Sequence, residues 1–189
     1  MSANTAPSDL GKHFLEDAML EFRKSKRLSD SALAQTSDQN VFKSIDAEAN
    51  SIAIVMKHMS GNMRSRWTNF LTTDGEKPDR NRDDEFVINA WDTRTSLAAA
   101  WENGWRCVLE SVGSLSPDDL SRTITIRGEP HTVVQAINRQ MTHYAYHTGQ
   151  IVFLARHFAG AQWKSLSIAR GESRRHEVAK DGSTYLPRK

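Results

Sequence analysis

Residues 132–160, TVVQAINRQMTHYAYHTGQIVFLARHFAG, decide the fold of this chain. Thr132 followed three residues later by Gln135 is typical of a helix start, and Gly160 is a typical helix end, with no proline between them. Apolar side chains recur in this segment at intervals of three and four residues, so one helix face must pack against partner helices. The residues on this face are Val134, Ile137, Met141, Ala145, Val152, Ala155 and Phe158.

Two histidines lie beside this apolar face. His143 and His147 are four residues apart, so their imidazoles project in the same direction and can reach one point, as metal ligands do. Such pairs also occur on solvated or half-buried helix faces. Gln140 and Gln150 extend the same face by a turn each way and favour a site, because both can orient a ligand. Gly149 is unfavourable in a helix interior, which predicts the close approach of a second helix.

The composition indicates one soluble domain with an ordinary core. The 189 residues are 38% hydrophobic and 25% charged, with a formal charge of +2. Basic and acidic residues are mixed, which predicts a solvated surface and no nucleic-acid partner. No segment approaches the ~20 apolar residues of a membrane span, and the N-terminus lacks a secretory pattern. A single cysteine, Cys107, excludes an internal disulfide, so we expect a cytoplasmic protein in which Cys107 is a packing residue.

Three further long helices are predicted from the apolar periodicity, over residues 8–35, 47–71 and 92–112. His58 lies in the second of them and is followed one turn later by Gly61, a change to small residues that leaves room for a ligand. A lone helical histidine is usually a packed or surface residue. A partner elsewhere in the fold changes that interpretation, and the pair on the last helix is the obvious partner.

The segments between these helices are shorter and more polar. Residues 122–132 alternate around a turn sequence and predict a short β-hairpin before the last long helix. Residues 73–84, TDGEKPDRNRDD, predict a charged surface loop. The chain is therefore expected to be all-α, with a disordered N-terminus (1–7), a four-helix bundle (8–162) and a C-terminal arm and tail (163–189).

Several segments resemble the DinB-like superfamily of bacterial four-helix-bundle proteins. The resemblance covers nearly the whole chain. It is carried by a mid-helix histidine in IVMKHMSGNMRSRW (54–67) and by H-x-x-x-H in MTHYAYHTGQIVFLAR (141–156). The segments SGNMRSRWTNFLTTDGEKPDRNRDDEF (60–86), TITIRGEPHTVVQAINRQ (123–140) and WKSLSIARG (163–171) look like one uncharacterised branch of that superfamily.

The resemblance implies a bundle whose second and fourth long helices present three histidines to one divalent metal, commonly zinc or nickel. Carried over residue by residue, the implied ligands are His58, His143 and His147. Some superfamily members are thiol-dependent enzymes, among them bacillithiol S-transferases and the mycothiol-dependent maleylpyruvate isomerase. The branch itself implies no particular reaction.

The chemistry of the residues leads to two competing expectations. Three neutral imidazoles suit zinc, nickel, cobalt or copper and leave at least one coordination position open, which predicts a metal-dependent enzyme. Its small-molecule substrate would be an electrophile, attacked by a low-molecular-weight thiol as co-substrate or by water, and Arg66 and Arg170 are candidates for receiving an anionic group. The alternative is a non-catalytic metal-binding stress-response protein; a third interpretation is a bundle without metal. Aromatic residues expected at the surface predict a homodimer.

Overall fold

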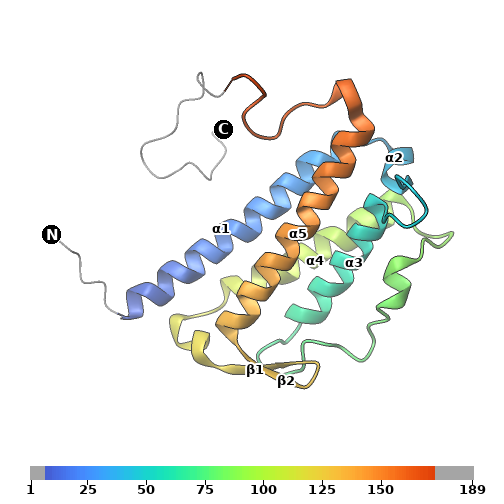
Figure 1. Ribbon diagram of the computed structural model, residues 1–189. Coiled ribbons are helices and arrows are strands. Elements are labelled where there is room, and N and C mark those ends of the chain that lie inside the picture. The colour runs from blue at the N-terminus through green and yellow to red at the C-terminus, as the bar shows by residue number, and fades with distance from the viewer. Residues whose placement is uncertain (1–6, 173–189) are drawn as a thin grey trace.

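The computed structural model describes residues 7–172, so the predictions for residues 1–6 and 173–189 lie outside the described part of the chain. Within it, four long helices and a small hairpin form the bundle (Figure 1). The elements in order are α1 (Pro7–Leu33), α2 (Asp38–Phe42), α3 (Ile52–Trp67), η1 (Asp83–Phe86), α4 (Arg94–Gly113), η2 (Pro117–Ser121), β1 (Thr123–Ile126), β2 (Glu129–Thr132), α5 (Val133–Ala159) and η3 (Gly160–Gln162). The predicted all-α bundle with a hairpin before the last long helix is therefore confirmed.

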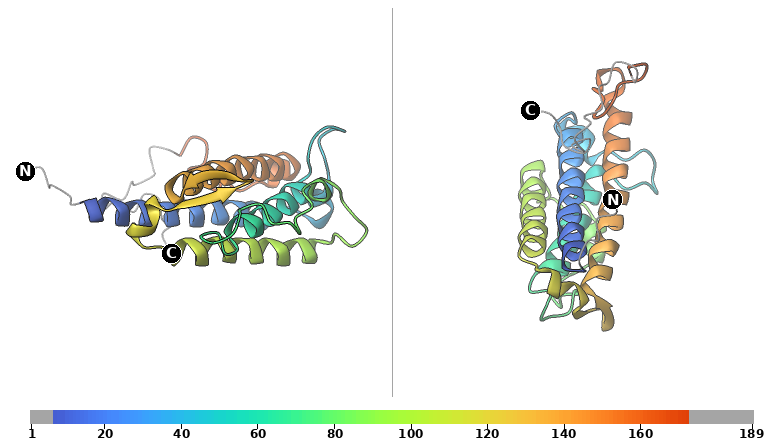
Figure 2. Two further views of the ribbon diagram at one scale, coloured as in Figure 1. Left: turned by 90° about the horizontal axis from the view of Figure 1, so that it is seen from below. Right: turned by 90° about the vertical axis from the view of Figure 1, so that its left-hand side faces the viewer.

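The four long helices pack against one another in specific pairs. Helix α3 packs along α4, α1 packs along α5, and α3 also contacts α5. The right-hand view of Figure 2, in which the left-hand side of Figure 1 faces the viewer, shows α1 between α4 and α5. The contact between α3 and α5 is the one that positions the histidines.

Local sequence signals explain most of the helix boundaries. Helix α4 begins after a capping box formed by Thr93 and Ser96, and α5 begins after one formed by Thr132 and Gln135. Helix α5 ends at Gly160, whose positive φ of 54° suits glycine. These starts and this end agree with the sequence prediction.

The second long helix is shorter than predicted. It spans residues 52–67 rather than 47–71, because Ser51 is its N-cap and accepts a hydrogen bond from the backbone N–H of Ile54. The preceding residues form bends, and Thr68 leaves the helix with an extended ψ of 118°. A capping serine inside an apolar-periodic stretch therefore set the true boundary.

Buried aromatic side chains form much of the core, and their polar atoms tie the helices together. Trp67 Nε1 on α3 donates to Tyr144 Oη on α5 at 3.0 Å, and that hydroxyl donates to Asn62 Oδ1 at 3.2 Å. Trp101 Nε1 on α4 donates to Asp30 Oδ1 on α1 at 2.8 Å. Each of these bonds joins two different helices, so they fix the register of the helices as well as their contact.

The hairpin is held to the loop that follows α3. Arg127 and Gly128 both have positive φ, 58° and 76°, as a two-residue type I′ turn requires. The Asp74 carboxylate accepts hydrogen bonds from both of their backbone N–H groups at 2.8 Å. Gly75 N also donates to Thr125 O at 2.8 Å. The loop is thereby fastened to the end of the bundle.

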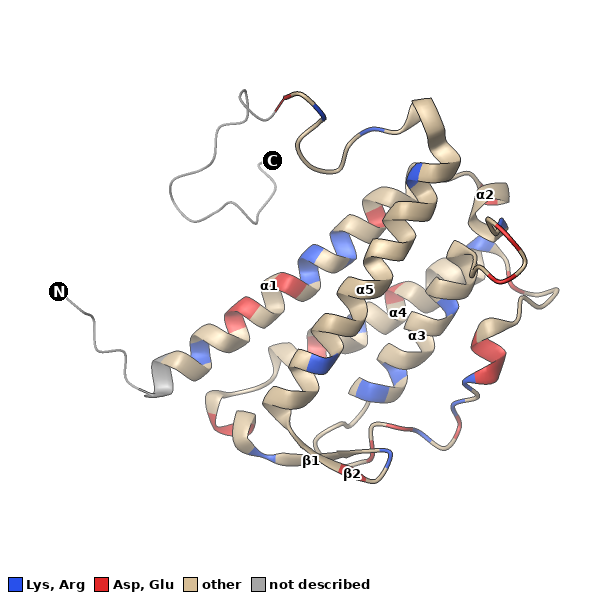
Figure 3. Cartoon of the chain, in the orientation of Figure 1, with Lys and Arg blue, Asp and Glu red and all other residues tan. Residues whose placement is uncertain are grey.

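The charged segment predicted as a surface loop runs alongside α3, with acidic and basic residues alternating along it (Figure 3). Four of its eight charged residues are exposed (Asp79, Arg82, Asp83 and Asp84), whereas the side chains of Arg80 and of Glu85, just beyond the segment, are buried. Their side chains are only 2% and 7% exposed. Among the described residues, no helix is both long and apolar enough to cross a bilayer.

Gly149 does not lie at a helix contact. A Cβ placed on it would meet no other atom within 4 Å, so the predicted close approach of a second helix is wrong. Among the glycines that do mark close packing are Gly104 on α4, which faces Met63, and Gly61 on α3, which faces Glu85.

Candidate metal centre

Three histidines from two helices meet between α3 and α5. His58 lies on α3, and His143 and His147 lie one turn apart on α5. One ring nitrogen of each lies within 4.8 Å of those of the other two, which makes them a group that could hold a metal ion. His58 and His147 are buried and His143 is half-buried. The helical repeat alone places the pair on α5 together, whereas His58, implied by the resemblance, reaches them through the packing of α3 on α5.

The distances between the nitrogens match those in a metal site. His143 Nε2 lies 3.3 Å from His58 Nε2 and 3.0 Å from His147 Nε2. With metal–nitrogen bonds of about 2.0–2.1 Å, two ligands of a tetrahedral ion lie about 3.3 Å apart. These two separations are close to this value, so both pairs that include His143 are already spaced as ligands of one ion.

Two of the rings are oriented by hydrogen bonds on the side away from the centre. His58 Nδ1 lies 2.9 Å from Glu85 Oε2, and His147 Nδ1 lies 2.7 Å from Gln150 Oε1. Both oxygens are acceptors, so both Nδ1 atoms donate. A neutral imidazole that donates through Nδ1 keeps a lone pair on Nε2, which is the tautomer a metal needs. Gln150, which the sequence placed on this face, thus contacts one of the three histidines directly.

This proton arrangement leaves the centre short of hydrogen-bond donors. With neutral His58 and His147 carrying their protons on Nδ1, only His143 can place a proton on Nε2. That single N–H faces two lone pairs, one on each neighbouring ring. A cation at the centre would instead accept electron density from all three nitrogens. The three nitrogens therefore suit a metal ion better than they suit hydrogen bonds among themselves.

Electrostatics keep the rings on α5 neutral. Burial, and then the neighbouring rings of His147 and His58, lower the pKa of His143 to about 3. Arg66 and Arg80 act in the same direction from further away. Burial also lowers the pKa of His147. Both rings therefore offer lone pairs at neutral pH, without a proton that an ion would have to displace.

A buried ion pair supports His58 from behind. Arg80 donates through Nε to Glu85 Oε1 and through a terminal nitrogen to Glu85 Oε2, both at 2.8 Å. Burial alone would raise the pKa of Glu85, but the hydrogen bonds from Arg80 and His58 hold that pKa below its usual range. An ionised Glu85 is a strong acceptor for His58 Nδ1–H.

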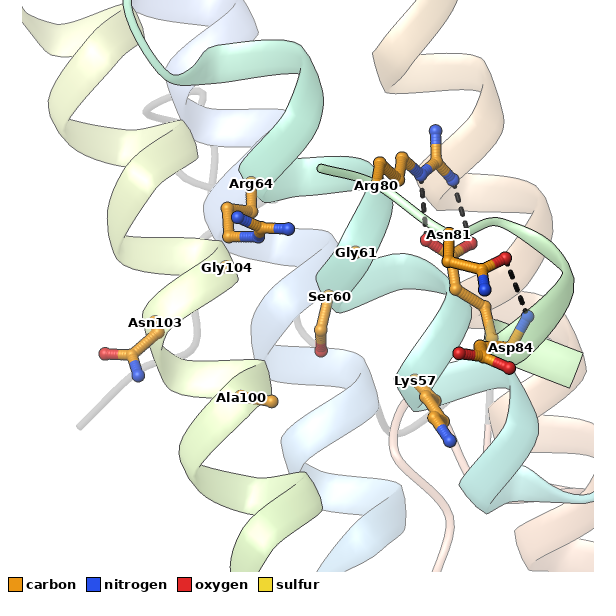
Figure 4. A pocket seen from close by; sticks show the side chains of 11 residues that line it. Lys57, Ser60, Gly61, Arg64, Arg80, Asn81, Asp84, Ala100, Asn103 and Gly104 are labelled. Atoms are coloured by element: carbon orange, nitrogen blue, oxygen red, sulfur yellow. Dashed lines mark hydrogen bonds and ion pairs between the residues drawn. The ribbon is translucent and has the colours of Figure 1, made fainter. Parts of the chain in front are cut away.

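Gly61 makes room for this carboxylate. A Cβ on Gly61 would lie 2.1 Å from Glu85 Oε1. Figure 4 shows Gly61 on the α3 ribbon and, close to it, the two contacts of Arg80 drawn as dashed lines. The space predicted beside His58 for a ligand is therefore filled by Glu85.

Sequence reasoning missed Glu85 and Arg80. Arg80 lies within a run of charged residues and Glu85 at its end, and no local spacing distinguishes them from their neighbours. The change from charge to Phe86 is the one nearby signal of burial, and Phe86 does contact the His58 ring, with centroids 5.0 Å apart.

The remaining candidates divide between the surface, the core and a neighbouring cavity. His13 and His157 are exposed, Arg170 is exposed, and the half-buried Cys107 contacts Thr68. Gln140, predicted to help orient a ligand, makes no hydrogen bond through its buried Oε1. Together with Arg66 and His143, it lines a cavity of about 350 Å³ between α3 and α5.

Comparison with known proteins agrees with the fold. A crystal structure of a DinB-like protein from Bacillus cereus ATCC 10987 matches with a TM-score of 0.58 and 14% sequence identity, covering 78% of this chain and 91% of that chain. At this identity the likeness concerns the fold alone. The protein thus shares the helical-bundle fold of that DinB-like protein, and its bundle carries three histidines that could hold a metal ion.

The family is defined more closely by sequence. The chain belongs to the family described as "Protein of unknown function (DUF1572)", whose model matches residues 9–172. No curated protein matches the chain.

Proposed function

We propose that this protein is a metal-dependent enzyme in which His58, His143 and His147 hold a divalent transition metal, zinc or nickel. Its reaction would be the transfer of a low-molecular-weight thiol to a small electrophile, or the hydrolysis of that electrophile. The observation that carries this proposal is the convergence of one ring nitrogen from each of three histidines, two of which, His58 and His147, are oriented through Nδ1 by Glu85 and Gln150. The homodimer expected from the sequence stays a prediction.

The number of ligands favours catalysis over a purely structural metal. Among the described residues the cluster contains three potential ligands and no fourth. Structural zinc sites are usually closed by four protein ligands, whereas catalytic sites leave a position for water or substrate. His143 also lines a cavity large enough for a small molecule.

The residues of the chain have definable roles in such a reaction. A bound divalent ion would supply Lewis acidity, which favours the deprotonated form of a thiol or water. Glu85 and Gln150 hold protons on the outer nitrogens of His58 and His147, so those rings present lone pairs and do not rotate. The buried Arg80 keeps Glu85 ionised.

Elemental analysis of protein purified without a histidine tag tests metal binding first. We expect His58→Ala, His143→Ala and His147→Ala each to lower the bound metal strongly. His13→Ala and His157→Ala are matched controls, because both side chains are exposed and remote from the cluster. Full metal occupancy in His58→Ala would show that α3 contributes no ligand and would remove the proposal.

A thiol panel then separates the enzyme from a non-catalytic metal-binding protein. Protein loaded with cobalt or nickel is titrated with low-molecular-weight thiols, and then assayed with an electrophilic aromatic substrate. A thiolate-to-metal charge-transfer band together with turnover supports the transferase. Metal binding with neither a band nor turnover of any electrophile favours the non-catalytic alternative.

A further inference from the structure

The cavity beside His143 has a lining of unusual charge. It lies between α3 and α5, measures about 350 Å³, and its lining includes Arg66 and Arg139 but neither aspartate nor glutamate. The other polar side chains around it are neutral, among them the amides of Asn62 and Gln140 and the hydroxyl of Tyr146. A concave, cationic surface without a carboxylate favours an anionic occupant.

Arg66 forms the buried end of this lining. Its side chain is 5% exposed, and Nη1 donates to Glu76 Oε2 at 2.8 Å and to the backbone carbonyl of Gly75. The Nε atom is buried and has no hydrogen-bond partner. The protein therefore holds the guanidinium through Nη1, while the Nε–H donor has no partner.

Gln140 gives a second, independent sign of a missing partner. The residue is 3% exposed, and its Oε1 is buried without a hydrogen bond. Buried polar atoms are nearly always paired in folded proteins, because leaving them unpaired costs free energy. The unpaired groups on this lining are thus a donor, Arg66 Nε, which an anionic oxygen can satisfy, and an acceptor, Gln140 Oε1, which needs an N–H or O–H group of the ligand.

Arg139 supplies the accessible charge. It is exposed, and the structure gives it no ion pair with any described residue. Arg139 and His143 are four residues apart on α5, so they lie one turn apart on the same helix face. An anion held by Arg139 would therefore lie next to the three-histidine cluster.

We propose that this cavity binds a small molecule through a carboxylate or phosphate group held by Arg66 and Arg139, beside His143. A cavity of this volume is at the lower end of the range for ligand pockets, about 300–1,000 Å³, which suits a molecule the size of a benzoate ring. That the anion is the substrate of the histidine cluster rests on the proposed function, whereas its binding does not.

Titration calorimetry with three ring compounds tests the charge requirement. Benzoate and phenyl phosphate carry the two anionic groups, and benzamide is a neutral analogue of similar shape. We expect at least one anion to bind in the millimolar range or tighter, and benzamide to bind at least about tenfold more weakly, the loss typical of a charge-assisted hydrogen bond. The better anion then identifies the carboxylate or phosphate class.

A pair of arginine variants locates the binding site. Arg139→Gln should weaken binding of the anion by about tenfold. Arg156→Gln is the matched control, because Arg156 is exposed on the same helix but lies outside this cavity, and it should leave binding unchanged. Equal binding of benzamide and the anions, equal effects of the two variants, or no binding of either anion would each overturn the proposal.

Repeating the titration after treatment with a chelator separates this site from the metal. Binding that survives chelation and remains sensitive to Arg139→Gln supports a guanidinium site, even if the histidine cluster proves to have no activity. Binding that disappears with the metal means that the anion is only a metal ligand, which overturns the role given to Arg66 and Arg139 while leaving the proposed function intact.

Discussion

Glu85 Oε2 lies 2.9 Å from His58 Nδ1, although the two residues are 27 positions apart and Glu85 belongs to a segment that is mostly solvated. Carboxylate–histidine pairs of this kind orient metal ligands and raise the basicity of the coordinating nitrogen. Here the carboxylate is itself fixed by Arg80 and accommodated by Gly61. The geometry of the candidate centre therefore depends on residues that cannot touch the ion.

Replacing Glu85 should weaken metal binding without removing a ligand. In Glu85→Gln the charge on the acceptor is lost, so we expect zinc affinity to fall by about 10–100-fold. Unfolding in denaturant should also show a loss of about 3 kcal/mol, because Arg80 is left buried without its main partner. Asp84→Asn changes the exposed neighbouring carboxylate and should alter neither property. Unchanged zinc affinity in Glu85→Gln would contradict the orienting role.

Two glycines in helix interiors should respond in opposite ways to alanine. Gly61→Ala places a methyl group on the Glu85 carboxylate, so it should lower both stability and zinc affinity. Gly149→Ala adds a methyl group into open space and should stabilise the protein by up to about 1 kcal/mol, the difference in helix propensity. Thermal unfolding and zinc titration of both variants measure this contrast. The same sign of stability change in both would refute it.

Asp74 should make stability depend on pH in acid. Burial alone would raise the pKa of its carboxyl, but backbone hydrogen bonds from Glu76, Gly128 and Arg127 lower it to about 2 from an ordinary value of 3.8. A lowered pKa stabilises the fold above the unfolded value, and this contribution is lost as pH falls from 3.8 toward 2.

The variant Asp74→Asn measures that contribution. Because the carboxylate is partly solvated, we expect a cost of only about 1 kcal/mol at pH 7, shrinking as pH falls below about 4. Denaturant unfolding at several pH values detects this. Asp118→Asn, at an exposed site on η2, should show no such change. A cost for Asp74→Asn that is independent of pH would show that the charge is not responsible.

Removing the metal should lower stability but leave the fold intact. The described residues bury an apolar core that includes Trp67, Trp105, Phe22 and Ile137 independently of any ion, so the helical circular dichroism should persist in chelator. An ion present at ~1,000 times its Kd adds about 4 kcal/mol, which corresponds to a rise in Tm on the order of 10 °C. His143→Ala is the control, because its Tm should not respond to chelation. Loss of helicity in the wild type on chelation would instead make the metal structural.

The sequence by itself determined the parts of this protein that depend on neighbouring residues. The capping boxes at Thr93 and Thr132 act over three residues, and the turn at Arg127–Gly128 acts over two, so their local chemistry predicts the helix starts and the hairpin. His143 and His147 are brought together by the helical repeat alone. The resemblance to DinB-like proteins added His58 before any contact was known.

Only the tertiary structure decided which side chains support and surround the cluster. Whether a charged side chain in the loop after α3 faces solvent or contacts Arg80 depends on how that loop folds back against the helix. The pattern of charges along the sequence does not predict this folding. For the same reason the sequence predicted a close approach at Gly149 and ligand space at Gly61, whereas the close approach is at Gly61, because a glycine is needed only where another part of the chain lies against it. Contacts of this kind form between residues far apart in the chain, so local periodicity cannot predict them.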